Sequence, residues 1–178
     1  MIKTNQEQHN DVDIFFAMSL GNWLTQKTSY NPGLKKHTTS KTKTSINRLN
    51  KENTTIDLGE DKKLKNISSG GTAFVYNVYS EKGESRASSV LTYAKDLSSA
   101  SSKRLYKFCK SSQDESIKGT FELIGGVLKV LVKINTITIE EKIWFVNNNV
   151  RLTRSTVKDR KHCVLISFAS EIKIIQKQ

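Results

Sequence analysis

The chain has 178 residues, which is enough for one domain with its own hydrophobic core. Lysine and arginine number 29 against 17 aspartate and glutamate residues, so the formal net charge is 29 − 17 = +12. No stretch approaches the ~18 consecutive apolar residues of a membrane helix, and two cysteines are too few for a disulfide scaffold. We expect a soluble single domain over residues 1–178, with residues 1–9 disordered and no signal or transit peptide.

The excess of positive charge predicts an acidic partner, which leaves nucleic acid, a membrane surface, and an acidic protein or ligand open. The basic residues are spread along the chain, and no RNP-like aromatic platform or zinc-finger spacing accompanies them. No spacing of histidine, cysteine and acidic residues matches a metal site, so no metal is predicted. Charge therefore indicates the sign of the partner and does not indicate a function.

One helix is predicted near the N-terminus, over residues 10–20. Four side chains share one face at the 3.6-residue period: Val12, Phe15, Phe16 and Ser19. Gly21 follows at the position where a helix would stop, and from there the period changes to two. This change predicts a strand over residues 21–30, which ends at the turn residues Asn31, Pro32 and Gly33.

The polar stretch over residues 35–65 predicts strands over 44–49 and 54–58 and a helical turn over 60–65. From residue 73 onward, short strands alternate with tight turns, over residues 73–79, 89–94, 104–109, 118–124, 127–135, 136–146, 150–157 and 163–175. With one helix and no βαβ alternation, this spacing predicts an all-β fold, an antiparallel barrel or sandwich of about ten strands.

Alternation along the strands predicts which side chains face the interior. In the last strand the bulkier set is assigned to the interior: Val164, Ile166, Phe168, Ser170, Ile172 and Ile174. That assignment places Leu165, Ser167, Ala169, Glu171 and Lys173 outside. In the strand over 136–146 the inward set is Ile137, Ile139, Glu141, Ile143 and Phe145. A carboxylate among isoleucines needs a partner, so Glu141 is a candidate functional residue.

The three asparagines at 147–149 set the register of the hairpin that follows. A three-residue loop would pair Phe145 with Arg151 and Glu141 with Ser155, and would turn Arg151 into the interior. A two-residue loop would shift the register by one residue and turn Arg151 outward. The sequence leaves both registers open.

Four blocks in the C-terminal third resemble a known family. They read EEKIWF at 140–145, NVRL at 149–152, STVK at 155–158 and SFASEI at 167–172. They resemble the C-terminal signature of the S-type phycobiliprotein lyases, the CpcS/CpeS family, whose pattern is close to EERIWF, NLRLRTS and SFCSEIR. The opening segment is similar too, including the Gly-x-Trp of lipocalin-like barrels, at Phe15, Phe16, Ser19, Gly21, Trp23 and Thr28.

The resemblance implies a lipocalin-like antiparallel barrel of ten strands that binds an open-chain bilin. It implies a chromophore lyase, which attaches the bilin through a thioether bond to a cysteine of an apo-phycobiliprotein subunit. Phycoerythrobilin or phycocyanobilin would be a substrate, with no separate cofactor. The implied partners are the bilin and the apo-phycobiliprotein, without nucleic acid or membrane, and a homodimer or a second lyase subunit stays open. A lipocalin-type carrier without catalysis is the alternative.

The resemblance also implies a set of site residues. Arg151 and Glu141 fall at the positions of the family's bilin-contacting arginine and acid, which makes both of them catalytic and ligand-binding candidates, and Ser155 matches the serine beside them. A bilin has an apolar middle, two propionates and pyrrole N–H donors. An apolar cavity that holds one cation and one carboxylate suits all three features.

Two positions depart from the family pattern. The family's second arginine falls at Thr153, and Arg154 stands one residue later, where strand alternation points it away from Arg151 unless a bulge intervenes. Tyr76 stands in place of a family tryptophan and can still stack on a pyrrole ring. Arg154 and Tyr76 are therefore included among the bilin-binding candidates. Trp23 is predicted to be a structural plug at the closed end of the barrel.

The residue usage gives one indication of source. Lys, Asn and Ile are abundant at positions where the family tends to carry Arg, Gly or Val, which is typical of an AT-rich genome. We therefore expect a plastid location, in the chloroplast stroma, with the cytoplasm of a cyanobacterium as the alternative.

Overall fold

The computed structural model describes residues 5–48, 73–80, 82–95, 106–111 and 116–175. Within them the elements follow the order α1 (Asn5–Ser19), β1 (Gly21–Asn31), β2 (Lys36–Arg48), β3 (Ala73–Ser80), β4 (Ser85–Lys95), β5 (Tyr106–Ser111), β6 (Ser116–Ile124), β7 (Val127–Ile134), β8 (Ile137–Asn147), β9 (Val150–Asp159) and β10 (His162–Lys173). The predicted all-β fold with one N-terminal helix is confirmed. No helix in these ranges is long and apolar enough to span a membrane.

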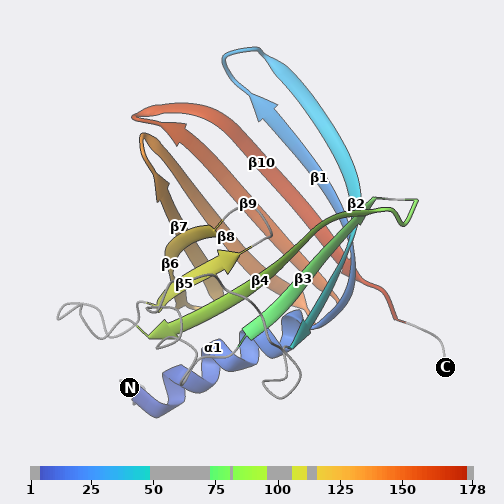
Figure 1. Ribbon diagram of the computed structural model, residues 1–178, viewed down its shortest axis with the longest axis vertical. Helices are drawn as coiled ribbons and strands as arrows, with labels where there is room; N and C mark the ends of the chain where they lie inside the picture. Colours follow the sequence, from blue (N-terminus) through green and yellow to red (C-terminus); the bar gives the residue numbers. More distant parts are fainter. Residues whose placement is uncertain (1–4, 49–72, 81, 96–105, 112–115, 176–178) are drawn as a thin grey trace.

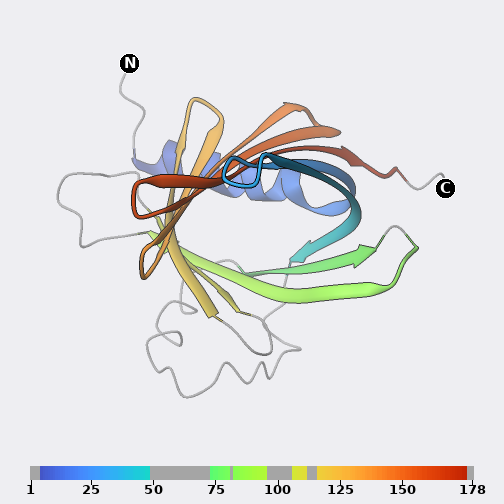
Figure 2. The same cartoon turned by 90° about the horizontal axis from the view of Figure 1, so that it is seen from above.

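The strands form one closed antiparallel barrel (Figures 1 and 2). Each strand from β2 to β10 pairs with its neighbour in the sequence, and β1 closes the ring by pairing with β10. Among the strands that the structure describes, closure leaves no unpaired edge, which removes the usual route to edge-to-edge aggregation. A barrel of ten strands is wider than the eight-stranded barrels whose interior side chains can just fill, so it has room for a ligand.

Tight turns set the register of the hairpins. Gly125 and Gly126 join β6 to β7 with φ values of 58° and 77°. Two consecutive residues of positive φ form the turn whose twist matches that of the paired strands, and glycine adopts this geometry without steric strain. The Gly-Gly hairpin predicted from the sequence is therefore confirmed.

Helix α1 lies across one end of the barrel, and the β1–β2 turn lies at the other end (Figure 1). The predicted face of the helix, Val12, Phe15, Phe16 and Ser19, is buried. Its apolar members join a core with Phe74, Tyr93, Phe121, Leu128 and Val132 from the strands. The helix thus plugs the barrel with its one apolar face, as burial of an amphipathic helix requires.

Several predicted boundaries are corrected. The helix begins at Asn5 instead of residue 10, so residues 5–9, expected to be disordered, are helical. Strand β2 begins at Lys36, eight residues before the strand predicted over 44–49 (44 − 36 = 8), because its Thr- and Ser-rich first half pairs with β1 along its whole length. The strand predicted over 54–58 and the helical turn predicted over 60–65 lie outside the described residues.

The assignment of faces in β10 is wrong. Ser167, Ala169 and Glu171 are buried, whereas three members of the predicted inward set, Ile166, Phe168 and Ile172, are exposed. The prediction assumed that the bulkier face of the strand packs inside. A barrel with a wide interior does not need bulky side chains on its whole inner wall, and here small and polar side chains line the inside of β10. In β8 the predicted face is confirmed, because Ile139, Ile143 and Phe145 pack against the core.

Candidate functional site

The hairpin between β8 and β9 has the register that turns Arg151 inward. Phe145 pairs with Arg151 and Glu141 pairs with Ser155, as the three-residue loop predicts. The loop itself is shorter than three residues, because Asn147 pairs with Val150. The register then shifts between Asn147 and Phe145. The bulge at this shift supplies the extra residue that the three-residue loop would have supplied.

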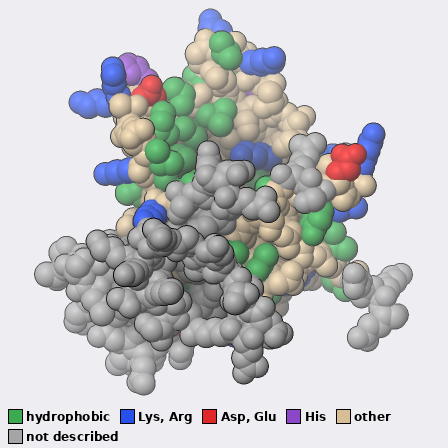
Figure 3. All heavy atoms as spheres, in the orientation of Figure 1, with side chains coloured by type: hydrophobic (Ala, Val, Ile, Leu, Met, Phe, Trp, Pro, Cys, Tyr) green, Lys and Arg blue, Asp and Glu red, His purple; other side chains and the backbone are tan. Residues whose placement is uncertain are grey.

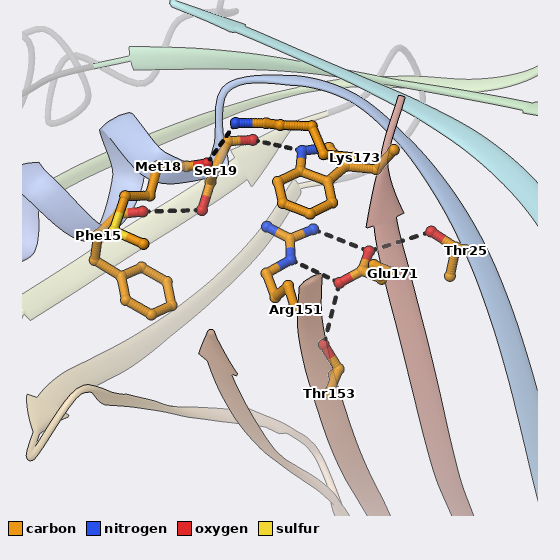
Figure 4. A network of polar contacts seen from close by, with 9 residues as sticks. Phe15, Met18, Ser19, Thr25, Arg151, Thr153, Glu171 and Lys173 are labelled. Atoms are coloured by element: carbon orange, nitrogen blue, oxygen red, sulfur yellow. Dashed lines mark hydrogen bonds and ion pairs between the residues drawn. The ribbon is translucent and has the colours of Figure 1, made fainter. Parts of the chain in front are cut away.

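Arg151 forms a buried ion pair with Glu171 on the neighbouring strand β10 (Figure 4). Its Nε donates to Glu171 Oε2 at 2.7 Å, and its Nη2 donates to Oε1 at 2.9 Å. This is the two-bond geometry in which a guanidinium matches a carboxylate most closely. The pair is therefore locally neutral and fixed in orientation.

Two hydroxyl groups complete the surroundings of the Glu171 carboxylate. Thr25 Oγ1 donates to Oε1 at 3.2 Å, and Thr153 Oγ1 donates to Oε2 at 3.4 Å. The carboxylate thus accepts from three residues on the two strands that flank β10: Thr25 on β1, and Arg151 and Thr153 on β9 (Figure 4). Within the described part of the chain, Arg151 Nη1 forms no hydrogen bond, so one edge of the guanidinium stays available to a ligand.

Trp23 connects this pair to helix α1. Its ring is fully buried and lies 4.9 Å from the Arg151 guanidinium carbon and 5.1 Å from Lys173 Nζ, both cation–π distances. Its Nε1 donates to the Ser19 carbonyl at 2.9 Å, while Lys173 Nζ donates to the Met18 carbonyl at 3.1 Å. Both bonds use carbonyls at the end of α1, which have no partner inside the helix. The predicted role of Trp23 as a plug at the closed end agrees with this placement.

Tyr76 lies close enough to the pair to respond to both of its charges. Burial raises the pKa of the Tyr76 phenol to about 12; the positive charge of Arg151 lowers this pKa and the negative charge of Glu171 raises it. The phenol is therefore neutral at any physiological pH, and it can serve as a hydrogen-bond donor. Tyr76 also packs against the apolar core, so its ring lies between the apolar and polar parts of the interior.

Hydroxyl-bearing side chains cover the inner wall beyond the pair. Ser155 and Ser167 are buried and opposite each other, and Ser167 shares a hydrogen bond of 2.9 Å with Ser29. Figure 3, in the orientation of Figure 1, shows hydrophobic side chains gathered over β7 to β9, whereas the surface over β10 and β1 is mostly tan, the colour of the backbone and of uncharged polar side chains. The interior thus has an apolar side and a hydroxyl-rich side.

Two charged side chains on this wall have no partner among the described residues. Glu141 is half-buried and faces inward with Ile139 and Ile143. Lys27 lies between Thr25 and Ser29 on a strand without a register shift, so it faces inward as well, and it is exposed. An unpaired acid and an unpaired base inside a barrel are costly unless a ligand or water meets them.

The structure brings four of the five candidate residues to the interior. Arg151, Ser155, Glu141 and Tyr76 all face inward, whereas Arg154 is exposed on the outer face, as strand alternation predicts. Sequence reasoning missed Glu171, although it lies in the quoted SFASEI block, because the face of β10 was inverted. It also missed Lys27. The period-two pattern that follows Trp23 could have placed Lys27 on the same face of the strand as the buried tryptophan.

Comparison with known proteins identifies the family. A family model described as CpeS-like protein matches residues 11–174. The chain belongs to this CpeS-like family. It is 28% identical over 174 residues to the chromophore lyase CpcS/CpeS of Thermosynechococcus vestitus, covering 92% of this chain and 93% of that protein. It is 41% identical over 49 residues to a chromophore lyase CpcS/CpeS homolog of Pyropia yezoensis, covering 28% of this chain and 33% of that protein.

Solved structures agree on the fold. The S-type phycobiliprotein lyase CPES from Guillardia theta matches 99% of this CpeS-like chain and 100% of its own, with a TM-score of 0.67 and 18% identity. Rv2717c from M. tuberculosis matches 93% of this chain and 98% of its own, with a TM-score of 0.51 and 6% identity. The resemblance seen in the sequence is thus confirmed at the level of family and fold.

Proposed function

We propose that this CpeS-like protein is a chromophore lyase, which binds an open-chain bilin in the barrel and directs its attachment to a cysteine of an apo-phycobiliprotein. The observation that carries the proposal is the family match over residues 11–174, with near full-length relatives named chromophore lyases. The interior supports it, because an apolar side and a hydroxyl-rich side suit a ligand with an apolar middle and polar edges.

Three groups of the interior have a counterpart on a bilin. The Glu141 carboxylate can accept hydrogen bonds from pyrrole N–H groups, and a bond to a charged acceptor is stronger than one between neutral groups. The free edge of Arg151 can donate to a propionate while Glu171 holds the opposite edge. Tyr76, with its neutral phenol, offers a ring for stacking on a pyrrole.

The reaction itself needs no oxidant or metal. The cysteine S–H adds across one carbon–carbon double bond of the bilin A ring, so a C–S bond and a C–H bond form while the S–H bond and the π bond break. The protein contributes orientation, because a bilin fixed at both edges presents one end of the chromophore to the incoming thiol. A carboxylate at the pyrrole nitrogens also stabilises positive charge that develops on the ring system.

The compartment that we propose is the plastid stroma, with the cytoplasm of a cyanobacterium as the alternative. The abundance of Lys, Asn and Ile supports this proposal, because their codons are favoured in AT-rich genomes. The acceptor is proposed to be an apo-phycobiliprotein subunit, and an assay with the purified chain alone tests whether a second lyase subunit is needed.

The decisive experiment has two steps. The purified protein is first mixed with phycoerythrobilin or phycocyanobilin, and we expect a sharpened, red-shifted absorption band of the bound pigment. An apo-phycobiliprotein subunit is then added, and thioether formation is measured on the denatured acceptor. Pigment binding without thioether formation would identify a lipocalin-type carrier, and the absence of pigment binding would overturn the proposal.

A matched pair of variants tests the role of Glu141. Glu141→Gln removes the charge of an inward carboxylate that has no partner in the described part of the chain. Glu140→Gln removes the charge of its neighbour, whose side chain is 51% exposed and pairs with Lys158. We expect Glu141→Gln to weaken bilin binding about 10- to 100-fold, the loss of a charged hydrogen bond, and to shift the pigment's absorption. Equal spectra and affinities for both variants would assign Glu141 to structure.

A further inference from the structure

The outer face of β1 and β10 carries an exposed apolar strip. We define the outer strip as Leu24, Ile166, Phe168 and Ile172, which are 38%, 40%, 48% and 54% exposed. Leu24 lies directly opposite Ile172, and the two residues that flank Leu24, Trp23 and Thr25, face inward. Branched and aromatic side chains left in water over two adjacent strands are typical of an interaction surface.

A row of positive charges meets this strip. Lys129, Lys142 and Arg154 are consecutive partners across β7, β8 and β9, and Arg154 lies directly opposite Phe168. Like charges directly opposite each other on a sheet destabilise it. Glu122 lies 3.7 Å from Lys129, but Lys142 and Arg154 have no acidic partner in the ranges that the structure describes. We refer to these three residues as the basic row.

We propose that the outer strip and the basic row together form a docking surface for an acidic protein. The inference rests on the proposed function, under which this partner is the apo-phycobiliprotein acceptor. An acidic patch on a partner would relieve the repulsion between Lys142 and Arg154, and an apolar patch would cover Phe168 and its neighbours. An apolar centre beside charged groups is the usual composition of a protein–protein interface.

The charge distribution selects this partner over a second copy of the chain. A self-complementary dimer on this face would bring basic rows of two chains near each other, and each chain has a net charge of +12. Nucleic acid would match the basic row but would leave half-exposed Ile and Phe side chains uncovered. An acidic protein surface with an apolar patch would match the charge of the basic row and cover the outer strip.

The docking surface also adjoins the site through the backbone. Lys142 follows Glu141 in β8, and Ile172 follows Glu171 in β10, so neighbouring residues point to the outer surface and to the interior. A partner on the outer face would therefore contact the strands that position the interior charges.

The main experiment measures association of the apo-acceptor with the bilin-free protein at about 0.05 M salt. We expect Lys142→Glu with Arg154→Glu to slow association at least about 10-fold, and the effect to shrink at about 0.5 M salt because exposed charges are screened. The control is Lys35→Glu with Lys161→Glu, which changes the net charge equally at two exposed turn residues. We expect the control to slow association less than about threefold.

A second pair of variants tests the apolar part. Phe168→Ser should speed dissociation of the acceptor about 10-fold or more, as loss of a large apolar contact does. Leu34→Ser, at a turn residue that is 73% exposed, should leave dissociation unchanged. Circular dichroism on all variants checks that the barrel is intact.

The outcomes separate this inference from the proposed function. Bilin binding is followed by absorption without acceptor, so its failure in the wild-type protein overturns the function, whereas unchanged association in the charge-reversed variant overturns the docking surface alone. The docking surface is also overturned if Phe168→Ser converts a dimer to a monomer in sedimentation. It is overturned as well if the charge reversal abolishes binding to anionic vesicles or oligonucleotides and leaves acceptor binding intact.

Discussion

Glu171 determines how Arg151 can act. The carboxylate takes two donors of the guanidinium, at 2.7 and 2.9 Å, and receives further bonds from Thr25 and Thr153. A buried arginine without such an acid would be a mobile, uncompensated charge. With it, the guanidinium is held against Trp23 and presents one fixed edge, so the interior gains a directional donor at little net charge.

Stability measurements should show the buried nature of this pair. Glu171→Gln leaves Arg151 without its counter-charge at a site where the glutamate side chain is 10% exposed, and we expect unfolding to become easier by about 3 kcal/mol. Glu140→Gln breaks an exposed pair with Lys158 and should change stability by less than about 1 kcal/mol. Urea denaturation of both variants gives the comparison, and equal effects would show that the Arg151–Glu171 pair contributes no more than a surface pair.

At the residue scale, the sequence predicted the parts of the site that depend on local alternation. The prediction that Glu141 is functional followed from its place among isoleucines. Arg151 was predicted to face inward under one of the two registers that the sequence left open. The Arg151–Glu171 contact could not be predicted, because it depends on which face of β10 points inside. The width of the closed barrel decides which face of β10 points inside, and the sequence of a single strand does not reveal that width.

Helix α1 is the element that closes the barrel. Phe16 stacks on Phe74 and Tyr93 at 5.1 and 4.7 Å between ring centroids, and Phe15 meets Phe145 at 5.1 Å. Lys173 and Trp23 bond to the last carbonyls of the helix. The end of the helix and the charged pair are therefore connected through one tryptophan.

Two helix variants should separate the packing face from the solvent face. Phe16→Ala removes a buried ring at the centre of the aromatic cluster, and we expect a loss of about 3–5 kcal/mol in the free energy of unfolding. Ile14→Ala truncates a side chain that is 56% exposed and should cost less than about 0.5 kcal/mol. Thermal and urea unfolding measure both, and a mild effect of Phe16→Ala would mean that the barrel is stable without its plug.

The elements were more predictable than their inner and outer faces. Turn residues and period-two runs placed most strands from β3 to β10 close to their observed bounds, since these signals are local, although β4, predicted over 89–94, spans Ser85–Lys95. Strand β2 was predicted too short because its first half is polar on both faces, and only pairing with β1 along its length keeps it extended. Where a strand lacks an apolar face, its neighbours determine its length.

At the scale of the whole molecule, the charges inside the barrel are distinct from those on its outer surface. Inside, Arg151 and Glu171 compensate each other, and Lys27 and Glu141 carry opposite charges that have no partner among the described residues. The net charge of +12 must therefore be carried mainly by other residues, including the outward-facing Lys142 and Arg154. Surface charges act mainly on the rate at which partners meet, whereas an interior ligand depends on fixed short-range bonds.

Salt should for this reason affect the two steps of the proposed function differently. Exposed charges are screened over ~8 Å at physiological ionic strength, and over ~3 Å near 1 M. Raising salt from about 0.05 M to about 0.5 M should slow thioether transfer to the acceptor about 10-fold when the acceptor is limiting, through slower association. Bilin affinity, followed by absorption in the same buffers, should change less than about twofold, because its polar contacts lie inside the barrel. A parallel loss in both steps would mean that the net positive charge serves the pigment's propionates directly. It would also mean that the interior is open enough for salt to reach the buried Arg151.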